Sequence, residues 1–221
     1  MIAEALINQM IPALKYSDKA EKAIIWMEEL KTNMLPVVHE KQFRGLITED
    51  SILESNDLNA RIEEFQLIGE NCYVTISQHL FDIIKTAQEQ GSELVAVVED
   101  DGEFLGVSSY EDTIMAFANT ATIQAEGGII VLSLTYKDYS LTDISRIIES
   151  NNAKIMGLYV SQHPSENEKV LITLKLNTSE MVSIIASLQQ YKFEVVARFN
   201  EFADDDDDKN RIEHLLRFID M

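Results

Sequence analysis

The chain contains two copies of one pattern, and this internal repeat limits its fold more than any other feature. Residues 17–27 align with residues 77–87 at an offset of 60, and each segment starts with a candidate N-cap serine, Ser17 or Ser77. Apolar residues follow at the spacing i, i+3, i+4, i+7, which puts them on one helix face. They are Ala20, Ala23, Ile24 and Met27 in the first copy, and Leu80, Ile83, Ile84 and Ala87 in the second.

The match continues beyond these helices. Residues 35–39 align with 95–99, and after a one-residue insertion in the second copy residues 43–48 align with 104–109. Each copy is therefore predicted to run strand, helix, strand, strand, helix. Units this small are expected to pack as a pseudo-twofold pair, because neither buries its sheet alone.

The end of the second copy holds the candidate site. Residues 94–98 form a short apolar run typical of a buried strand, and Asp101 and Gly102 both tolerate the positive φ of a hairpin turn. Ser109 then stands at a predicted helix N-cap, with Asp112 three residues later. Backbone N–H groups and a carboxylate at one helix start can hold a hydroxylated anionic ligand. The same two side chains can equally form a plain helix cap.

The repeated pattern resembles a tandem pair of cystathionine-β-synthase (CBS) domains, known as a Bateman module. The residues that carry the resemblance are Ser17–Asp18, Leu35–Val38, Gly45–Thr48, Val97–Val98 and Gly106–Asp112. It covers residues 1–124, with repeats of about 1–60 and 61–124, and it implies an α+β fold. It also implies that an adenosyl compound, such as AMP, ATP or S-adenosylmethionine, binds in a cleft between the repeats.

In the CBS family, a Ser or Thr followed three residues later by Asp holds the ribose. The second repeat keeps this pair as Ser109, expected to orient the phosphate or sugar, and Asp112, expected to accept bonds from the ribose hydroxyls. The first repeat has Thr48 followed by Ser51, and its Asp50 lies one residue early, which turns that side chain by about 100°. The resemblance therefore implies at most one intact ribose site. The ligand-binding candidates carried over by position are Ser109, Asp112, Val97, Ala96, Thr75, Thr48, Pro36 and Arg44.

Negative charge limits the choice of ligand. Residues 1–124 hold 22 acidic and 8 basic residues, a net charge of −14, which disfavours a triphosphate without a metal. Arg44 is the best local cation for a phosphate, and Lys41 is the next. We therefore expect AMP, adenosine or S-adenosylmethionine before ATP. The formal charge of −20 on the whole chain also argues against nucleic acid and anionic membranes as partners.

The remaining signals indicate a cytoplasmic protein that is not an enzyme. Cys72 is the single cysteine, so no internal disulfide framework is expected. We find neither a membrane-spanning apolar run nor a signal-peptide pattern. His39, His79, His163 and His214 have no second ligand at zinc spacing, so no metal site is expected. We also find no convergent set of nucleophile, acid and base.

Residues 128–200 follow a different pattern, after a candidate linker at 119–128. Helices are predicted after the candidate N-caps Ser140 and Asn177. Strands are predicted at 129–135, 153–160, 169–176 and 193–199. This βαββαβ order is the ferredoxin-like arrangement.

This order behind a CBS pair resembles an ACT domain, a regulatory fold that often binds amino acids at a dimer interface. Amino-acid-binding members favour an Asp followed by a glycine turn, but here Asp138 precedes Tyr139 and Ser140, which would crowd a ligand. A dimerising sheet without an amino acid is therefore the preferred interpretation. Seven acidic and seven basic residues at 127–200 suit self-association.

Two functional hypotheses stay open. The first is a non-enzymatic regulator whose CBS pair binds an adenosyl ligand and signals through a dimeric ACT-like domain. The second is a ligand-free dimerisation scaffold for an unknown protein partner. Residues 201–221 are expected to form an acidic linker and an amphipathic helix that docks on another domain or chain. Similar two-domain proteins are known as acetoin-utilisation accessory proteins.

Overall fold

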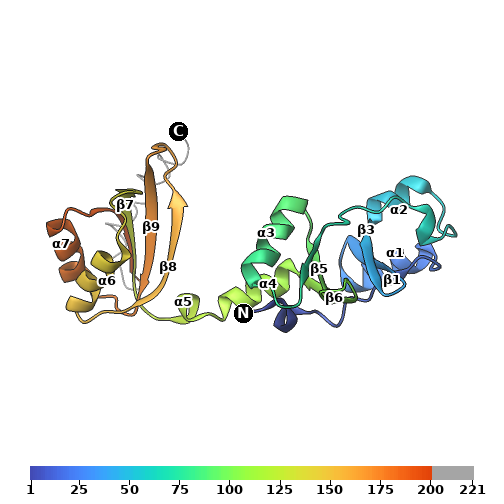
Figure 1. Cartoon of the computed structure of the whole chain (residues 1–221), viewed down its shortest axis with the longest axis horizontal. Helices are drawn as coiled ribbons and strands as arrows, with labels where there is room; N and C mark the ends of the chain where they lie inside the picture. The colour runs from blue at the N-terminus through green and yellow to red at the C-terminus, as the bar shows by residue number, and fades with distance from the viewer. Residues whose placement is uncertain (201–221) are drawn as a thin grey trace. The chain divides into compact units, whose positions relative to one another are not determined.

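A computed structural model describes residues 1–200 and divides the chain into two compact units (Figure 1). Unit 1 is Met1–Ala118, and unit 2 begins at Asn119. Both units combine helices with β-strands, so the predicted mixture of α and β structure is present. The boundary lies six residues before position 124, because helix α5 (Ala121–Gln124) packs against unit 2. The predicted acidic linker and C-terminal helix lie outside the described residues.

Unit 1 repeats one order of elements twice. Repeat 1 has β1 (Leu14–Lys15), α1 (Ala20–Leu30), β2 (Met34–His39), β3 (Gln42–Thr48) and α2 (Glu49–Ser55). Repeat 2 has β4 (Tyr73–Thr75), α3 (Leu80–Gln90), β5 (Leu94–Val98), β6 (Phe104–Ser109) and α4 (Tyr110–Ala118). Two short 3-10 helices precede the repeats, η1 (Ala3–Leu6) and η2 (Ile62–Glu64). In each three-stranded sheet the middle strand is parallel to the first and antiparallel to the third.

The first helix of each repeat starts later than its predicted N-cap. α1 follows Lys19, whereas the predicted cap was Ser17. α3 is capped by His79 instead of Ser77: its Nδ1 accepts a backbone N–H at 3.2 Å, and its own N–H donates to Asp82 at 3.0 Å. Lys19 and His79 each form a β-bridge with a segment from outside their repeat, so both stay extended and the helix begins one residue later.

The two repeats exchange the segments that precede them. Residues 2–8, which precede repeat 1, pair with repeat 2, and residues 61–68, which precede repeat 2, pair with repeat 1. We call these the leading segments. The β-bridges are Ile2–His79 and Asn8–Val107 for the first, and Arg61–Lys19 and Ile68–Leu46 for the second. The two sets of partners match at offsets of 59 to 61 residues, so the exchange follows the pseudo-twofold symmetry of the repeats.

The repeats also meet at their hairpins. Phe43 and Phe104 occupy equivalent positions, and their rings stack with centroids 6.2 Å apart. Lys41 Nζ lies 3.0 Å from Glu103 Oε1 beside them. Equivalent residues contact each other where a twofold axis passes between two copies, so this stacking marks the axis. The turn of repeat 2 places Gly102 alone at positive φ (+87°), in a longer turn than the two-residue hairpin predicted there.

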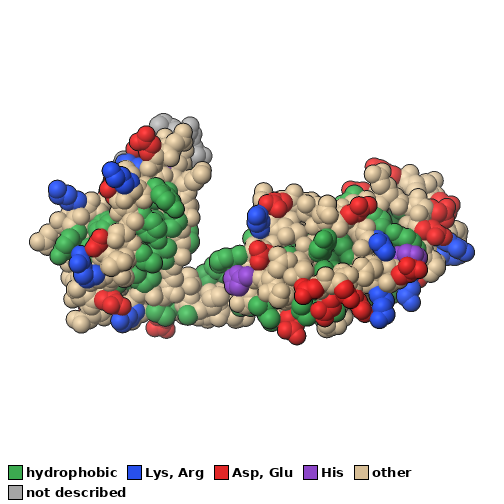
Figure 2. Space-filling model, viewed as in Figure 1, with side chains coloured by type: hydrophobic (Ala, Val, Ile, Leu, Met, Phe, Trp, Pro, Cys, Tyr) green, Lys and Arg blue, Asp and Glu red, His purple; other side chains and the backbone are tan. Residues whose placement is uncertain are grey.

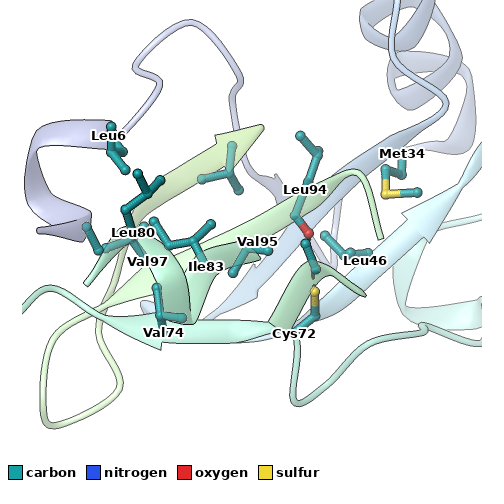
Figure 3. Packing of buried hydrophobic residues seen from close by; sticks show 13 residues of the cluster. Leu6, Met34, Leu46, Cys72, Val74, Leu80, Ile83, Leu94, Val95 and Val97 are labelled. Atoms are coloured by element: carbon teal, nitrogen blue, oxygen red, sulfur yellow. Dashed lines mark hydrogen bonds between the residues drawn. The ribbon is translucent and has the colours of Figure 1, made fainter. Parts of the chain in front are cut away.

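The hydrophobic core of unit 1 is shared between the repeats. One buried cluster is built mainly from repeat 2, but it includes Met34 and Leu46 of repeat 1 (Figure 3). The other is built mainly from repeat 1, but it includes Ile62 of the second leading segment. All three side chains are buried. Each repeat therefore needs residues from outside itself to complete its core.

Unit 2 contains one antiparallel sheet and two longer helices. Its elements are β7 (Ile129–Thr135), α6 (Leu141–Ser150), β8 (Ile155–Gln162), β9 (Lys169–Leu176), α7 (Val182–Gln190) and β10 (Glu194–Phe199). The strand order is β10-β7-β9-β8. Helices α6 and α7 lie on one face of the sheet (Figure 1). The core between them includes Ile130, Leu132, Ile144, Ile148, Ile172, Leu174, Ile184 and Leu188.

The two predicted helix caps of unit 2 have different outcomes. Ser140 caps α6 as predicted, because its hydroxyl accepts the N–H of Asp143 at 3.3 Å. Asn177 does not cap α7, which begins after Met181. The side chain of Asn177 instead accepts the N–H of Lys154 at 2.7 Å, because both residues lie at the same end of the β8–β9 pair.

Candidate functional site

Ser109 and Asp112 form a reciprocal cap at the start of α4. Ser109 is the last residue of β6, and its N–H and Oγ both donate to Asp112 Oδ2, at 2.9 and 2.6 Å. The N–H of Asp112 donates back to Ser109 Oγ at 3.1 Å. A serine at the N-cap and an acid three residues later satisfy two free N–H groups in this way. The structure thus joins the two residues that the sequence pattern singled out.

Asn8 reaches the same carboxylate from the first leading segment. Its Nδ2 lies 3.1 Å from Asp112 Oδ2 and 3.3 Å from Oδ1. The backbone N–H of Asn8 donates to the carbonyl of Val107 in β6 at 2.7 Å, and its Oδ1 accepts the N–H of Met10 at 2.9 Å. The sequence pattern did not predict Asn8 as a site residue, because it lies 104 residues from Asp112.

The corner made by Asn8, Ser109 and Asp112 is half-buried. Among the described residues, the hydrogen bonds to the carboxylate come from neutral donors, the side chain of Asn8 and the N–H and hydroxyl of Ser109. The positive end of the α4 dipole also favours negative charge there. These donors to Asp112 are an amide, a backbone N–H and a hydroxyl, and no Lys or Arg bond to it is found in this part of the chain.

The other candidates of repeat 2 lie farther along the sheet. Ser109 pairs with Leu94 at one end of β5, so Ala96 and Val97 lie two and three residues away, about 7 to 10 Å along the strand. Val97 is fully buried and belongs to the shared core (Figure 3). Ala96 is also fully buried, and Thr75 in β4 is half-buried. Val97 is therefore a packing residue in this structure.

In repeat 1, Ser51 stands at the position that corresponds to Asp112. Thr48 caps α2 by accepting the N–H of Ser51 at 3.3 Å, and Ser51 Oγ donates to the carbonyl of Thr48 at 2.8 Å. Asp50 is exposed. Ile68 of the second leading segment occupies the position that Asn8 has in the first. The corner of repeat 2 thus has the side chains of Asp112 and Asn8. The equivalent positions in repeat 1 are Ser51 and Ile68.

The remaining candidates of repeat 1 lie in its sheet. Pro36 is buried in β2 opposite Leu46, and Arg44 is exposed in β3. Lys41, the other predicted cation, pairs with Glu103 at the hairpins. These basic side chains belong to the repeat that lacks the acid, and one of them already has an acidic partner.

Cys72 is not placed for chemistry. It is fully buried, its Sγ donates to the carbonyl of Leu94 at 3.2 Å, and burial raises the pKa of its thiol (Figure 3). A raised pKa keeps the sulfur neutral, and the neutral thiol is a poor nucleophile. Within residues 1–200, no three His, Cys, Asp or Glu side chains gather as metal ligands would. The helices described there are also too short or too polar to cross a bilayer.

Unit 2 has a hollow of about 570 Å³ beside the start of α7. The residues that line it are Ser179, Glu180, Met181, Val182, Ser183, Ala186, Arg198 and Asn200. The sequence pattern predicted none of them. Asp138, the residue compared with amino-acid sites, instead lies just after β7, where it accepts the hydroxyl of Thr135 at 2.6 Å.

Several solved structures are similar to about half of the chain. A CBS domain pair/ACT domain protein from Thermotoga maritima is 19% identical with a TM-score of 0.50, over 53% of this chain and 96% of that chain. A CBS domain protein from Pyrobaculum aerophilum complexed with AMP is 14% identical (TM-score 0.45, covering 54% and 100%). The CBS domains of a transcriptional regulator from Streptococcus pneumoniae are 16% identical (TM-score 0.45, covering 52% and 98%).

The first of these likenesses establishes the architecture. It covers 53% of the chain, so the predicted fold of a CBS domain pair is confirmed for that share of the chain. No protein-family model matches the chain.

Proposed function

We propose that the chain is a non-enzymatic regulatory protein whose CBS pair binds an adenosyl compound at the corner of Ser109 and Asp112. The observation that carries this proposal is the position of the two side chains together at the start of α4, within a CBS-pair fold. A carboxylate can accept two bonds from a ribose diol, and the N–H groups of a helix start can bind a phosphate. The buried, unreactive Cys72 fits a reducing cytoplasm.

AMP is the ligand that we place first. Unit 1 carries 22 acidic and 8 basic residues, and Figure 2 shows acidic side chains over its visible face. This charge repels a triphosphate more than a monophosphate unless a metal accompanies the ligand. Adenosine and S-adenosylmethionine, which lack a phosphate, are the next candidates.

Thermal unfolding of the full chain with each ligand tests the proposal. We expect AMP to raise the melting temperature, since a ligand at a hundred times its Kd stabilises by about 2.7 kcal/mol. Asp112→Ala should remove this ligand-induced rise, whatever its effect on the unliganded protein. Asp50→Ala is the matched control, because Asp50 is an exposed acid in the first turn of the equivalent helix α2. An equal AMP-induced rise in wild type and Asp112→Ala would exclude this site.

We also propose that unit 2 is an ACT-like domain with the ferredoxin-like arrangement. The order of its elements, the strand order β10-β7-β9-β8 and the position of both helices on one face support this. In this proposal the ligand favours one mutual angle of the two repeats, and a dimer read through unit 2 transmits that preference.

A homodimer through unit 2 is part of the same proposal. Tyr159 pairs with Thr173, and Phe199 pairs with Ile129, so both aromatic side chains lie on the sheet face opposite the helices, where they are 59% and 42% exposed. Tyr159→Asp should lower the mass of the full chain in light scattering from two copies to one. Tyr136→Asp, which changes an exposed tyrosine outside the sheet, should leave the mass at two copies.

A ligand-free scaffold for an unknown protein partner is the second candidate function. The observation that favours it is the occupied state of the Asp112 carboxylate, which already receives bonds from Ser109 and Asn8. This function predicts that AMP, adenosine, ADP, ATP, S-adenosylmethionine and amino acids all leave the melting temperature unchanged.

A further inference from the structure

The carboxylate of Asp112 receives more hydrogen bonds than a helix cap needs. The cap itself consists of the Ser109 N–H bond to Oδ2 and the Asp112 N–H bond to Ser109 Oγ, and the Ser109 hydroxyl adds a second bond to Oδ2. Asn8 adds a third donor that spans both oxygens, at 3.1 and 3.3 Å. The Ser109 contacts are local and cap the start of α4. The Asn8 contact comes from the first leading segment, 104 residues away in the sequence. Asn8 is therefore the partner that can leave without opening the cap.

We propose that Asn8 is a built-in competitor for the ligand. Its carboxamide occupies the carboxylate that a ribose diol would use, and an adenosyl ligand binds by displacing it. This inference rests on the proposed function of the Ser109–Asp112 corner. It adds a control on affinity: the free energy of the Asn8–Asp112 contact is subtracted from that of ligand binding.

The other repeat shows that docking of a leading segment does not require this side chain. Ile68 forms a β-bridge with Leu46, as Asn8 does with Val107. Both bridges use backbone groups, and Ile68 has no polar side chain to offer. The amide thus occurs at the corner that has a carboxylate, and hydrocarbon occurs at the corner where Ser51 replaces it. Both leading segments dock through their backbone. The Asn8 side chain is therefore not needed for docking, and its role is to bind the Asp112 carboxylate.

The backbone around Asn8 is held by contacts that do not depend on its side chain. Its N–H donates to the carbonyl of Val107 at 2.7 Å. Ile7 packs so closely over Gly106 that a Cβ on this glycine would lie 2.5 Å from Ile7 Cγ2. Release of Asp112 therefore needs rotation of one side chain, with loss of the Met10 N–H contact to Asn8 Oδ1, and the leading segment stays in place.

Calorimetric titration of AMP into the full chain tests this inference. Asn8→Ala should bind AMP about tenfold more tightly than wild type, the size expected for loss of a competing hydrogen bond to a charged group. Gln9→Ala is the control, because Gln9 is the exposed neighbour, and it should bind as wild type does. Circular dichroism and thermal unfolding show whether Asn8→Ala is folded.

Each outcome separates the two proposals. If wild type and Asn8→Ala bind AMP equally, or if the variant binds more weakly, Asn8 is not a competitor and the proposed site still stands. If AMP binds the variant and not the wild type, the competitor role of Asn8 is supported, but AMP is not the ligand of the wild-type chain. If neither protein binds AMP, adenosine or S-adenosylmethionine, the proposed function is wrong and the competitor role falls with it. As a second readout, the NMR signals of the Asn8 carboxamide should move on adding AMP toward their position in Asp112→Ala.

Discussion

Ser108, next to the site serine, shows how much a single hydroxyl can cost. It is 1% exposed, and its Oγ has no hydrogen-bond partner among the described residues. Repeat 1 has the fully buried Ile47 at the equivalent position. A buried polar group without a partner costs about 1–3 kcal/mol. Ser108→Ala should therefore raise the free energy of unfolding by about 1 kcal/mol, measured by urea denaturation.

Ser92 provides the opposite case for comparison. It is also buried, but its hydroxyl donates to the carbonyl of Leu94 at 2.7 Å and accepts the Leu94 N–H at 3.3 Å. Ser92→Ala should lower stability by about 1 kcal/mol, because it removes two hydrogen bonds of the Leu94 backbone. If both alanine variants change stability in the same direction, hydroxyl pairing does not explain the difference.

Asp18 should make stability depend on pH. Burial raises the pKa of its carboxyl, but the N–H of Lys15 at 2.8 Å and the ammonium of Lys22 at 2.9 Å outweigh burial, so the pKa is lowered. The contribution is fully present above the ordinary value of 3.8 and is lost as the pH falls through the lowered folded-state pKa.

Urea denaturation at pH 7 and at pH 3 checks this effect. Asp18→Asn should be less stable than wild type at pH 7, and the gap between the two proteins should shrink at pH 3. Asp50→Asn should behave as wild type at both values, because Asp50 is exposed. A gap that stays constant or grows toward pH 3 would contradict the assignment to the ionised carboxylate.

At the scale of elements, Gly45 decides how closely a leading segment can approach β3. Its φ is +133°, and a Cβ there would lie 2.7 Å from the carbonyl oxygen of Ile68. Gly91 ends α3 at φ +60°, but a Cβ there would meet nothing within 4 Å. Gly45→Ala should therefore cost about 3 kcal/mol and Gly91→Ala about 1 kcal/mol, measured by urea denaturation. Equal costs would mean that backbone strain alone, and not the approach of Ile68, limits position 45.

Elements were predictable from the sequence where the signal is local. The spacing of Ala23 and Met27 in α1, and of Ile83 in α3, correctly identified buried helix faces. Ile84 was assigned to the same face, yet it is 44% exposed, because spacing alone does not give the width of the buried stripe. The cap formed by Ser109 with Asp112 was also predictable, since both partners lie within one turn.

Contacts between distant segments were not predictable. The N-cap assigned to Ser17 was wrong because Lys19 stays extended to pair with Arg61. Asn8 was missed for the same reason, since its partner Asp112 is 104 residues away in the sequence. Residue pairs so far apart in sequence become visible only when the arrangement of the two folded repeats is known. The repeat signalled that two copies pack together, but not which segment crosses to which copy.

At the scale of the whole molecule, unit 1 should unfold in one step. Its two clusters each include residues of the other repeat or its leading segment, such as Met34, Leu46 and Ile62. Residues 1–118 alone should therefore show one cooperative transition by calorimetry, whereas residues 1–60 alone should show no folded baseline in circular dichroism. A cooperative transition in residues 1–60 would show that the shared core is not required.

The crossing of the leading segments also bears on how such a chain arose. Before a duplication, a single copy of the sixty-residue pattern could have made the same crossing only by lending its first residues to a second, identical molecule. Fusion of the two gene copies would have turned this exchange of segments between molecules into an exchange within one molecule. It would also have allowed the two corners to differ in sequence, as Ser51 and Ile68 now differ from Asp112 and Asn8.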